Sequence, residues 1–214
     1  MNPKLNHLIP TLQNALKEPL PGQIAHKKMA RFGRRFNFNH DVPPKLAGVM
    51  ILLYPKADNI YFVLMERQGH PLDPHQHQIS LPGGKKETNE TLEQTAFRET
   101  YEEIGVHPDL IHIIGPLSTV FVGVSNFLIH PFIGIAREMP IFTPEIEEVK
   151  TLLEVPLNDI LTEKNIKVTD MVVRGYELKD VPYFDLAEKV VWGATAMVLS
   201  EFREILGEVG ALRF

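Results

Sequence analysis

Apolar residues recur at helical spacing near the start of the chain and in longer runs further on. The first set predicts an amphipathic helix that ends before Pro19, since residues three and four apart share a helix face. Its members are Leu5, Leu8, Ile9, Leu12 and Leu16. A polar, arginine-rich connector is expected over residues 23–44. Residues 46–54 and 60–67 are rich in β-branched and aromatic side chains and flank a turn-prone segment, so they are expected to form a β-hairpin.

The rest of the chain mixes strand and helix patterns. A polar loop at 68–78 leads into residues 79–84, and a helix is expected to begin near Asn89 or Thr91 and to end at Gly105. Further strands are expected at 110–114, 127–135, 148–153, 166–173 and 176–178, and a last helix at 193–206. This order predicts an α/β fold, an α/β/α sandwich around a mixed sheet. We expect residues 45–214 to form the main domain and residues 1–44 a helix and connector.

Composition narrows the chemistry and the partners. Zero cysteines exclude disulfides, thiol nucleophiles and cysteine-bound zinc, whereas 27 acidic residues leave hard-metal chemistry available. A net charge of -5 offers no general attraction for nucleic acid. The first 20 residues lack the apolar centre of a signal peptide, and the longest apolar run, 46–54, is too short to cross a bilayer. The sequence therefore predicts a soluble, cytoplasmic protein with no nucleic-acid or membrane partner.

Two opposed faces are expected on the helix that ends at Gly105. The face toward the sheet would carry Phe97, Thr100, Tyr101 and Ile104, and the opposite face Glu99, Glu102 and Glu103. Glutamates at these spacings repel one another. They either form an ordinary solvated face or bind a divalent cation, and hard oxygen ligands suit magnesium or manganese.

These glutamates belong to a longer spaced pattern. Its positions are Gly84, Glu90, Arg98, Glu99, Glu102, Glu103, Gly105 and Val106. Seven fixed identities at an average usage of about 6% would coincide by chance with a probability on the order of 10⁻⁹ per starting position. Residues 84–106 resemble the signature box of the Nudix hydrolases, with one departure at Thr100, where the family usually has an aliphatic residue. The resemblance implies a Nudix-type α/β/α sandwich and a hydrolase, or pyrophosphatase, acting on a diphosphate linkage.

The resemblance also implies a role for each matched residue. Arg98 is expected to hold the carboxylates by charge-assisted hydrogen bonds, and Glu90 to anchor the start of the helix. Gly83 and Gly84 would let the backbone approach the substrate closely. The expected ligands of Mg²⁺, or of Mn²⁺, are Glu99, Glu103 and Glu102, with the carbonyl group of Gly84.

A carboxylate is expected to take a proton from the attacking water, which the metal would orient. Glu102 is one candidate for this base. Glu147 and Glu148 are others, because many relatives draw a late glutamate from this region. The alternative for these two is an ordinary solvated loop or strand edge.

Two further stretches, 64–67 with 77–84 and 191–199, resemble the coenzyme A diphosphatase branch of the family. That branch usually has arginine at Asp73, glycine at His77 and phenylalanine at Leu81. Arg67, at a strand end, could meet a substrate phosphate or be an ordinary exposed arginine. Trp192 is expected to pack at the start of the last helix, with stacking on substrate as the alternative. Three histidines, His70, His75 and His77, are expected to be ordinary loop residues and not metal ligands, because their spacing matches no known ligand set.

The preferred function is hydrolysis of coenzyme A or its derivatives to 4'-phosphopantetheine, or its acyl form, and adenosine 3',5'-bisphosphate. ADP-ribose or another nucleoside diphosphate derivative is the alternative substrate. A non-catalytic nucleotide-binding regulator is the alternative of another class. The sequence leaves open whether the N-terminal helix covers the core or forms a homodimer contact.

Overall fold

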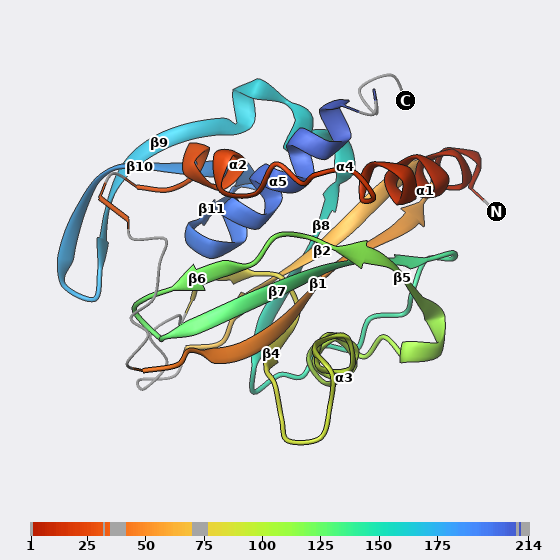
Figure 1. Ribbon diagram of the computed structural model, residues 1–214, viewed down its shortest axis with the longest axis horizontal. Coiled ribbons are helices and arrows are strands. Elements are labelled where there is room, and N and C mark those ends of the chain that lie inside the picture. The colour runs from red at the N-terminus through yellow and green to blue at the C-terminus, as the bar shows by residue number, and fades with distance from the viewer. Residues whose placement is uncertain (1, 32, 35–41, 70–76, 209, 211–214) are drawn as a thin grey trace.

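A mixed β-sheet with helices on both sides forms the centre of the computed structural model, which describes residues 2–31, 33–34, 42–69, 77–208 and 210 (Figure 1). The helices are α1 (Pro3–Ala15), α2 (Gly22–Lys28), α3 (Leu92–Ile104), α4 (Leu157–Leu161) and α5 (Gly193–Glu208), with 3₁₀ turns at Pro108–Leu110 and Glu163–Asn165. The strands of the main sheet are β1 (Lys45–Lys56), β2 (Asn59–Arg67), β3 (Ile79–Ser80), β4 (Gly83–Lys85), β5 (Ile111–Pro116), β6 (Val120–Val122), β7 (Phe127–Ala136) and β8 (Val149–Pro156). A second sheet contains β9 (Ile166–Val173), β10 (Tyr176–Leu186) and β11 (Lys189–Trp192).

The main sheet has the order β3-β2-β1-β7-β5, with β4 added to β1, β6 to β7 and β8 to β2. β1 and β7 run parallel, whereas the other neighbours are antiparallel. The predicted hairpin of residues 46–54 and 60–67 is confirmed, and so is the mixed sheet. In the second sheet the order is β11-β10-β9.

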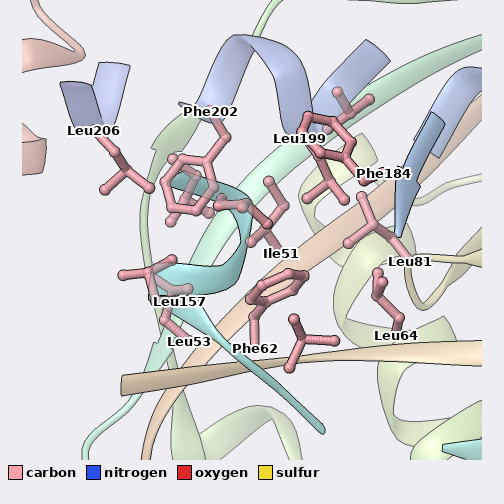
Figure 2. Packing of buried hydrophobic residues seen from close by; sticks show 14 of the residues in the cluster. Ile51, Leu53, Phe62, Leu64, Leu81, Leu157, Phe184, Leu199, Phe202 and Leu206 are labelled. Carbon is pink, nitrogen blue, oxygen red and sulfur yellow. The ribbon is translucent and has the colours of Figure 1, made fainter. Parts of the chain in front are cut away.

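Alternate residues of β1 separate two apolar cores. Ile51 and Leu53 point toward α1, α4 and α5, where they pack with Phe62 and Phe202 (Figure 2). Their neighbours on the other face, at positions 50, 52 and 54, pack with α3. This alternation follows from the two-residue period of a strand, and it confirms the expected α/β/α layers.

The N-terminal helix α1 lies on the first of these cores. Leu5, Leu8 and Leu12 are fully buried in the same cluster as the residues of β1 and α5. In the structure, α1 therefore covers the core. The boundary expected between residues 1–44 and 45–214 stays a prediction.

Part of the segment expected to be a polar connector forms the helix α2. His26 on this helix is buried and lies 3.2 Å from a carboxylate oxygen of Glu201 on α5. Glu201 also accepts hydrogen bonds from the backbone N–H groups of Gly22 and Ser118. These contacts come from distant parts of the chain, so the local pattern of polar residues could not indicate the helix.

Four other elements were missed or placed too short. The strand expected at 176–178 continues as β10 to Leu186, and the strands β6 and β11 and the helix α4 were not expected at all. The elements β6, β11 and α4 are short, and β10 contains charged and turn-forming residues, so none of the four shows a clear apolar period. Within the described residues, no helix is long and apolar enough to cross a membrane. The cytoplasmic location stays a prediction.

The helix α3 lies unusually close to β1 at Gly48. A Cβ atom at this position would overlap the backbone carbonyl oxygen of Leu92 and would lie 3.0 Å from the backbone nitrogen of Ala96. Only glycine therefore allows the helix to approach the sheet this closely, because neither backbone group can move without moving α3.

Replacing Gly48 should separate α3 from the sheet. We expect Gly48→Ala to lower the free energy of unfolding by about 1–3 kcal/mol, as for other overpacked positions, in a urea or thermal titration. The matched control is Gly207→Ala on α5, where an added Cβ would meet nothing within 4 Å. Equal effects of the two substitutions would contradict the close approach at Gly48.

Candidate active site

The candidate site forms where β1 and β2 separate. The two strands pair only at their hairpin end, through residues 53–56 and 59–62. Further along, β4 pairs with β1 and β3 pairs with β2, so residues 81–84 lie between the two strands. Gly83 has φ +146, a backbone conformation that favours glycine. The first residues of the motif therefore lie directly against α3.

The capping groups predicted for α3 are confirmed. Thr91, one of the two expected caps, forms a capping box with Gln94, in which each side chain bonds the other residue's backbone N–H. Gly105 ends the helix in the left-handed conformation, with φ 76. The backbone N–H groups of Thr143 and Glu145 then donate to the last carbonyl groups of the helix. The helix ends are thus fixed on both sides of the site.

The rotation of α3 about its axis differs from the expected one. Glu103 was expected on the outer face but is only 1% exposed, whereas Tyr101 was expected to face the sheet and is 51% exposed. Ala96 is fully buried, and the expected apolar face had left it out. Including it moves the centre of the buried face toward Glu103, which lies about 60° from Thr100 around the helix. Thr100 and Ile104 are buried as predicted.

The carboxylate of Glu103 is bound in the interior. Its Oε2 atom accepts a hydrogen bond of 2.7 Å from the backbone N–H of Gly83, and its Oε1 atom lies 3.6 Å from the Arg67 guanidinium. Burial raises the pKa of Glu103 to about 8, although Gly83 and Arg67 favour the charged form. The charges of Glu99 and Glu148 add to the increase. The groups of the chain around Glu103 therefore do not offset the effect of burial on its charged form.

Glu99 lies against the backbone of Gly84. A Cβ atom at Gly84 would be 2.5 Å from the carboxyl carbon of Glu99, so glycine is needed for this contact. Burial raises the pKa of Glu99, and the hydrogen bond from Arg98 only partly offsets it. Glu102 and Glu148 raise this pKa further through their charges.

Arg98 connects the motif's other glutamates. Its guanidinium donates two hydrogen bonds to Glu90, at 2.9 and 3.1 Å, and one each to Glu99 and Glu102, at 2.9 and 2.8 Å. The hydrogen bonds from Arg98 lower the pKa of Glu90 to about 2, although burial opposes them, and the Glu87 N–H and Thr95 hydroxyl also donate to Glu90. The geometry agrees with the expected positioning roles of Arg98 and Glu90.

The candidate bases occupy different surroundings. Glu102 has a side chain that is 54% exposed and is paired with Arg98. Glu148 is also exposed, but its charge acts on both Glu99 and Glu103, and its backbone carbonyl accepts a hydrogen bond of 2.7 Å from the N–H of Gln68, next to Arg67. Glu147 shows no such effect on either glutamate.

The donor atoms around Glu103 fit a hard divalent cation. Two carboxylates, Glu99 and Glu103, have their charge disfavoured by burial, and a cation would stabilise both. Among the described residues, no three acidic or histidine side chains are already gathered into a ligand set. A backbone oxygen, for which Gly84 is the expected donor, would have to contribute together with the two carboxylates.

Of the remaining expected residues, His77 and Trp192 fall within the part of the chain that the structure describes. His77 is exposed at the end of a turn, while His70, Asp73 and His75 lie outside the described residues. Trp192, the last residue of β11, is half-buried and lines a cavity with Glu66. The sequence did not single out Glu66, a buried acid between two lysines, because a strand-end glutamate carries no local sign of its partners.

Three comparisons relate this arrangement to known proteins. A NUDIX domain model matches residues 44–172. The chain is 32% identical over 163 residues to Nudix hydrolase 22, chloroplastic, of Arabidopsis thaliana, which covers 73% of this chain and 53% of the relative. It is also 32% identical over 130 residues to the peroxisomal coenzyme A diphosphatase ndx-8 of Caenorhabditis elegans, over 58% of this chain and 56% of the relative. The crystal structure of RenU, a Nudix hydrolase from M. smegmatis, superposes with a TM-score of 0.56 at 17% identity, over 82% of this chain and 96% of that chain.

The family match covers more than half of the 214 residues. The chain therefore belongs to the Nudix family, and the expected Nudix-type fold is confirmed. Similarity to RenU bears on the fold alone. The chain spans about half the length of the two curated relatives, 53% and 56%.

Burial of Glu103 predicts a pH-dependent stability of the metal-free protein. Its folded-state pKa of about 8 lies above the ordinary 4.5, so the stability that its protonated form contributes is complete below about 4.5 and is lost as the pH rises through about 8. In EDTA, the melting temperature of Glu103→Gln relative to the unsubstituted protein should therefore rise from about pH 5 to about pH 9. Glu93→Gln, an exposed position in the first turn of α3, is the control. A difference that is constant across this range would contradict the buried carboxylate.

Proposed function

We propose that the chain is a metal-dependent hydrolase that cleaves the diphosphate linkage of coenzyme A or its derivatives. The products would be 4'-phosphopantetheine, or its acyl form, and adenosine 3',5'-bisphosphate. The observation that carries the proposal is the buried carboxylate of Glu103, held by the Gly83 N–H next to Glu99. Two adjacent carboxylates with little access to water repel each other strongly unless a cation lies between them.

Mg²⁺, or Mn²⁺, would be held by Glu99, Glu103 and the Gly84 carbonyl group, with Glu102 completing the set once it leaves Arg98. When bound, the ion supplies positive charge to the diphosphate oxygens and to the attacking water. Arg98 keeps Glu99 in place through its hydrogen bond of 2.9 Å.

In this proposal, groups beside the carboxylate ligands act on the substrate and on the attacking water. Arg67, next to Glu103, presents its guanidinium to a phosphate oxygen, and the Gly83-Gly84 backbone lets the diphosphate approach closely. Glu148 takes the proton from the attacking water. It is favoured over Glu102 because Glu102 is paired with Arg98, and over Glu147 because Glu148 interacts with both buried glutamates.

Coenzyme A is the preferred substrate because of residues 64–67, 77–84 and 191–199, and because a relative named as a coenzyme A diphosphatase is 32% identical. The arginine that this branch usually has at Asp73 is missing, which leaves ADP-ribose or another nucleoside diphosphate derivative as the alternative substrate. A non-catalytic regulator is disfavoured because Glu90, Glu99, Glu102 and Glu103 are all present.

Activity should depend on both the metal and Glu103. With Mg²⁺, the purified protein is expected to convert coenzyme A to the two named products faster than it hydrolyses ADP-ribose or ATP, and EDTA should abolish turnover. Glu103→Gln should lower kcat by about 10³-fold or more, because a metal ligand is lost, while Glu93→Gln stays close to the unsubstituted enzyme. Activity on ADP-ribose alone would reject the preferred substrate. Nucleotide binding with no turnover of any of the three would support the regulator.

The choice of base predicts a difference between two adjacent glutamates. Glu148→Gln should lower kcat by about 10²-fold or more, since general bases contribute at least this much, whereas Glu147→Gln should stay within about twofold. Raising the pH should restore part of the activity of Glu148→Gln, because hydroxide then replaces the missing base. Similar kcat values for the two variants would exclude Glu148 as the base.

A further inference from the structure

A second candidate binding site lies on the other face of the main sheet. It is a cavity of about 430 Å³ between the ends of β2 and β3 and the second sheet, β9 to β11. Its walls include the apolar side chains of Ile79, Met171, Val173 and Trp192. Its volume lies within the range of small-molecule sites, about 300–1,000 Å³.

The cavity and the catalytic carboxylates meet at the end of one strand. Arg67 points to α3, where its guanidinium lies 3.6 Å from Glu103. Glu66, the residue before it, points to β11 and lines the cavity, where it accepts a hydrogen bond of 2.9 Å from Lys189. A substrate with its diphosphate next to Glu103 would therefore have to extend around the end of β2 to reach the cavity.

Among the described residues that line the cavity, positive charge exceeds negative charge. The buried Glu66 carboxylate accepts hydrogen bonds from both Lys189 and Lys150, so it neutralises only one of two lysines. Arg174, at the turn between β9 and β10, also lines the cavity, and its side chain forms no ion pair in the part of the chain that the structure describes. An anion attached to an aromatic group would match this combination of cations with an indole ring.

We propose that this cavity binds the nucleotide end of the diphosphate substrate, with the base against the Trp192 indole and the ribose phosphate facing Arg174 and Lys189. The identity of the substrate rests on the proposed function. Of the two ends of coenzyme A, only the nucleotide end has both an aromatic ring and a phosphate besides the diphosphate. The uncharged pantetheine end would leave Arg174 without an anionic partner among the described residues, whereas Lys189 is already bonded to Glu66.

Trp192 is the only tryptophan in the chain, so its fluorescence reports directly on the cavity. Adenosine 3',5'-bisphosphate, titrated into the metal-free protein in EDTA, should change the Trp192 emission in a saturable manner. Arg174→Gln should raise the Kd about tenfold through loss of one charge-assisted contact, whereas Lys17→Gln, a matched loss of one charge near the end of α1, should leave it unchanged. No change in emission, or a change with 4'-phosphopantetheine alone, would overturn the proposal.

Steady-state kinetics with Mg²⁺ separate this inference from the proposed function. Arg174→Gln should raise the KM for coenzyme A about tenfold and leave kcat within about twofold, since the contact lies away from the reacting phosphates. The KM for dephospho-coenzyme A, which lacks the ribose phosphate, should be the same for both proteins. If coenzyme A is hydrolysed and its KM does not respond to Arg174→Gln, the cavity proposal fails and the function stands. If coenzyme A is not hydrolysed, the function fails, and the fluorescence titration alone decides the cavity.

Discussion

The contact between α3 and β1 at Gly48 sets the position of the carboxylates in the site. Because Gly48 has no side chain, the backbone of α3 comes against the strand at Leu92 and Ala96. This packing turns Glu103 inward, under the residues that lie between the separated strands β1 and β2, where the Gly83 N–H donates to it. A buried carboxylate with a single strong donor is costly, since the charged form loses its hydration. The packing of α3 on β1 therefore also buries the Glu103 carboxylate, whose charged form a cation would stabilise.

The motif contains carboxylates of opposite electrostatic character, one just before α3 and others on the helix. Glu90 accepts two hydrogen bonds from Arg98 and has a pKa lowered to about 2, whereas burial raises the pKa of Glu103 to about 8. Glu90 is thus satisfied within the chain, and Glu103 and Glu99 are left for an external cation. In the proposed function, this difference would let one short motif supply both positioning residues and metal ligands. Arg98 links the two groups, since it bonds Glu90 and Glu99 at once.

The two faces of the main sheet have different parts in the proposed function. On the α3 side, the proposal places the reacting phosphates among the motif residues, Arg67 and Glu148. On the other side, the second sheet adds Trp192 and Arg174 to a cavity that the motif does not reach. Because consecutive residues of β2 point to opposite faces, the end of this one strand connects the two regions.

The local pattern determined most of the secondary structure, the ends of α3 at Thr91 and Gly105, and the set of motif residues, because capping groups and periodicity act over a few residues. It did not indicate α2 or the inward rotation of Glu103. Both depend on contacts made by residues far apart in the chain, His26 with Glu201 and α3 with Gly48. The raised pKa of Glu103 and the pairing of Glu66 likewise arise from burial and from distant partners. Tertiary structure alone decided these features, since desolvation depends on everything that surrounds a group and not on its neighbours in sequence.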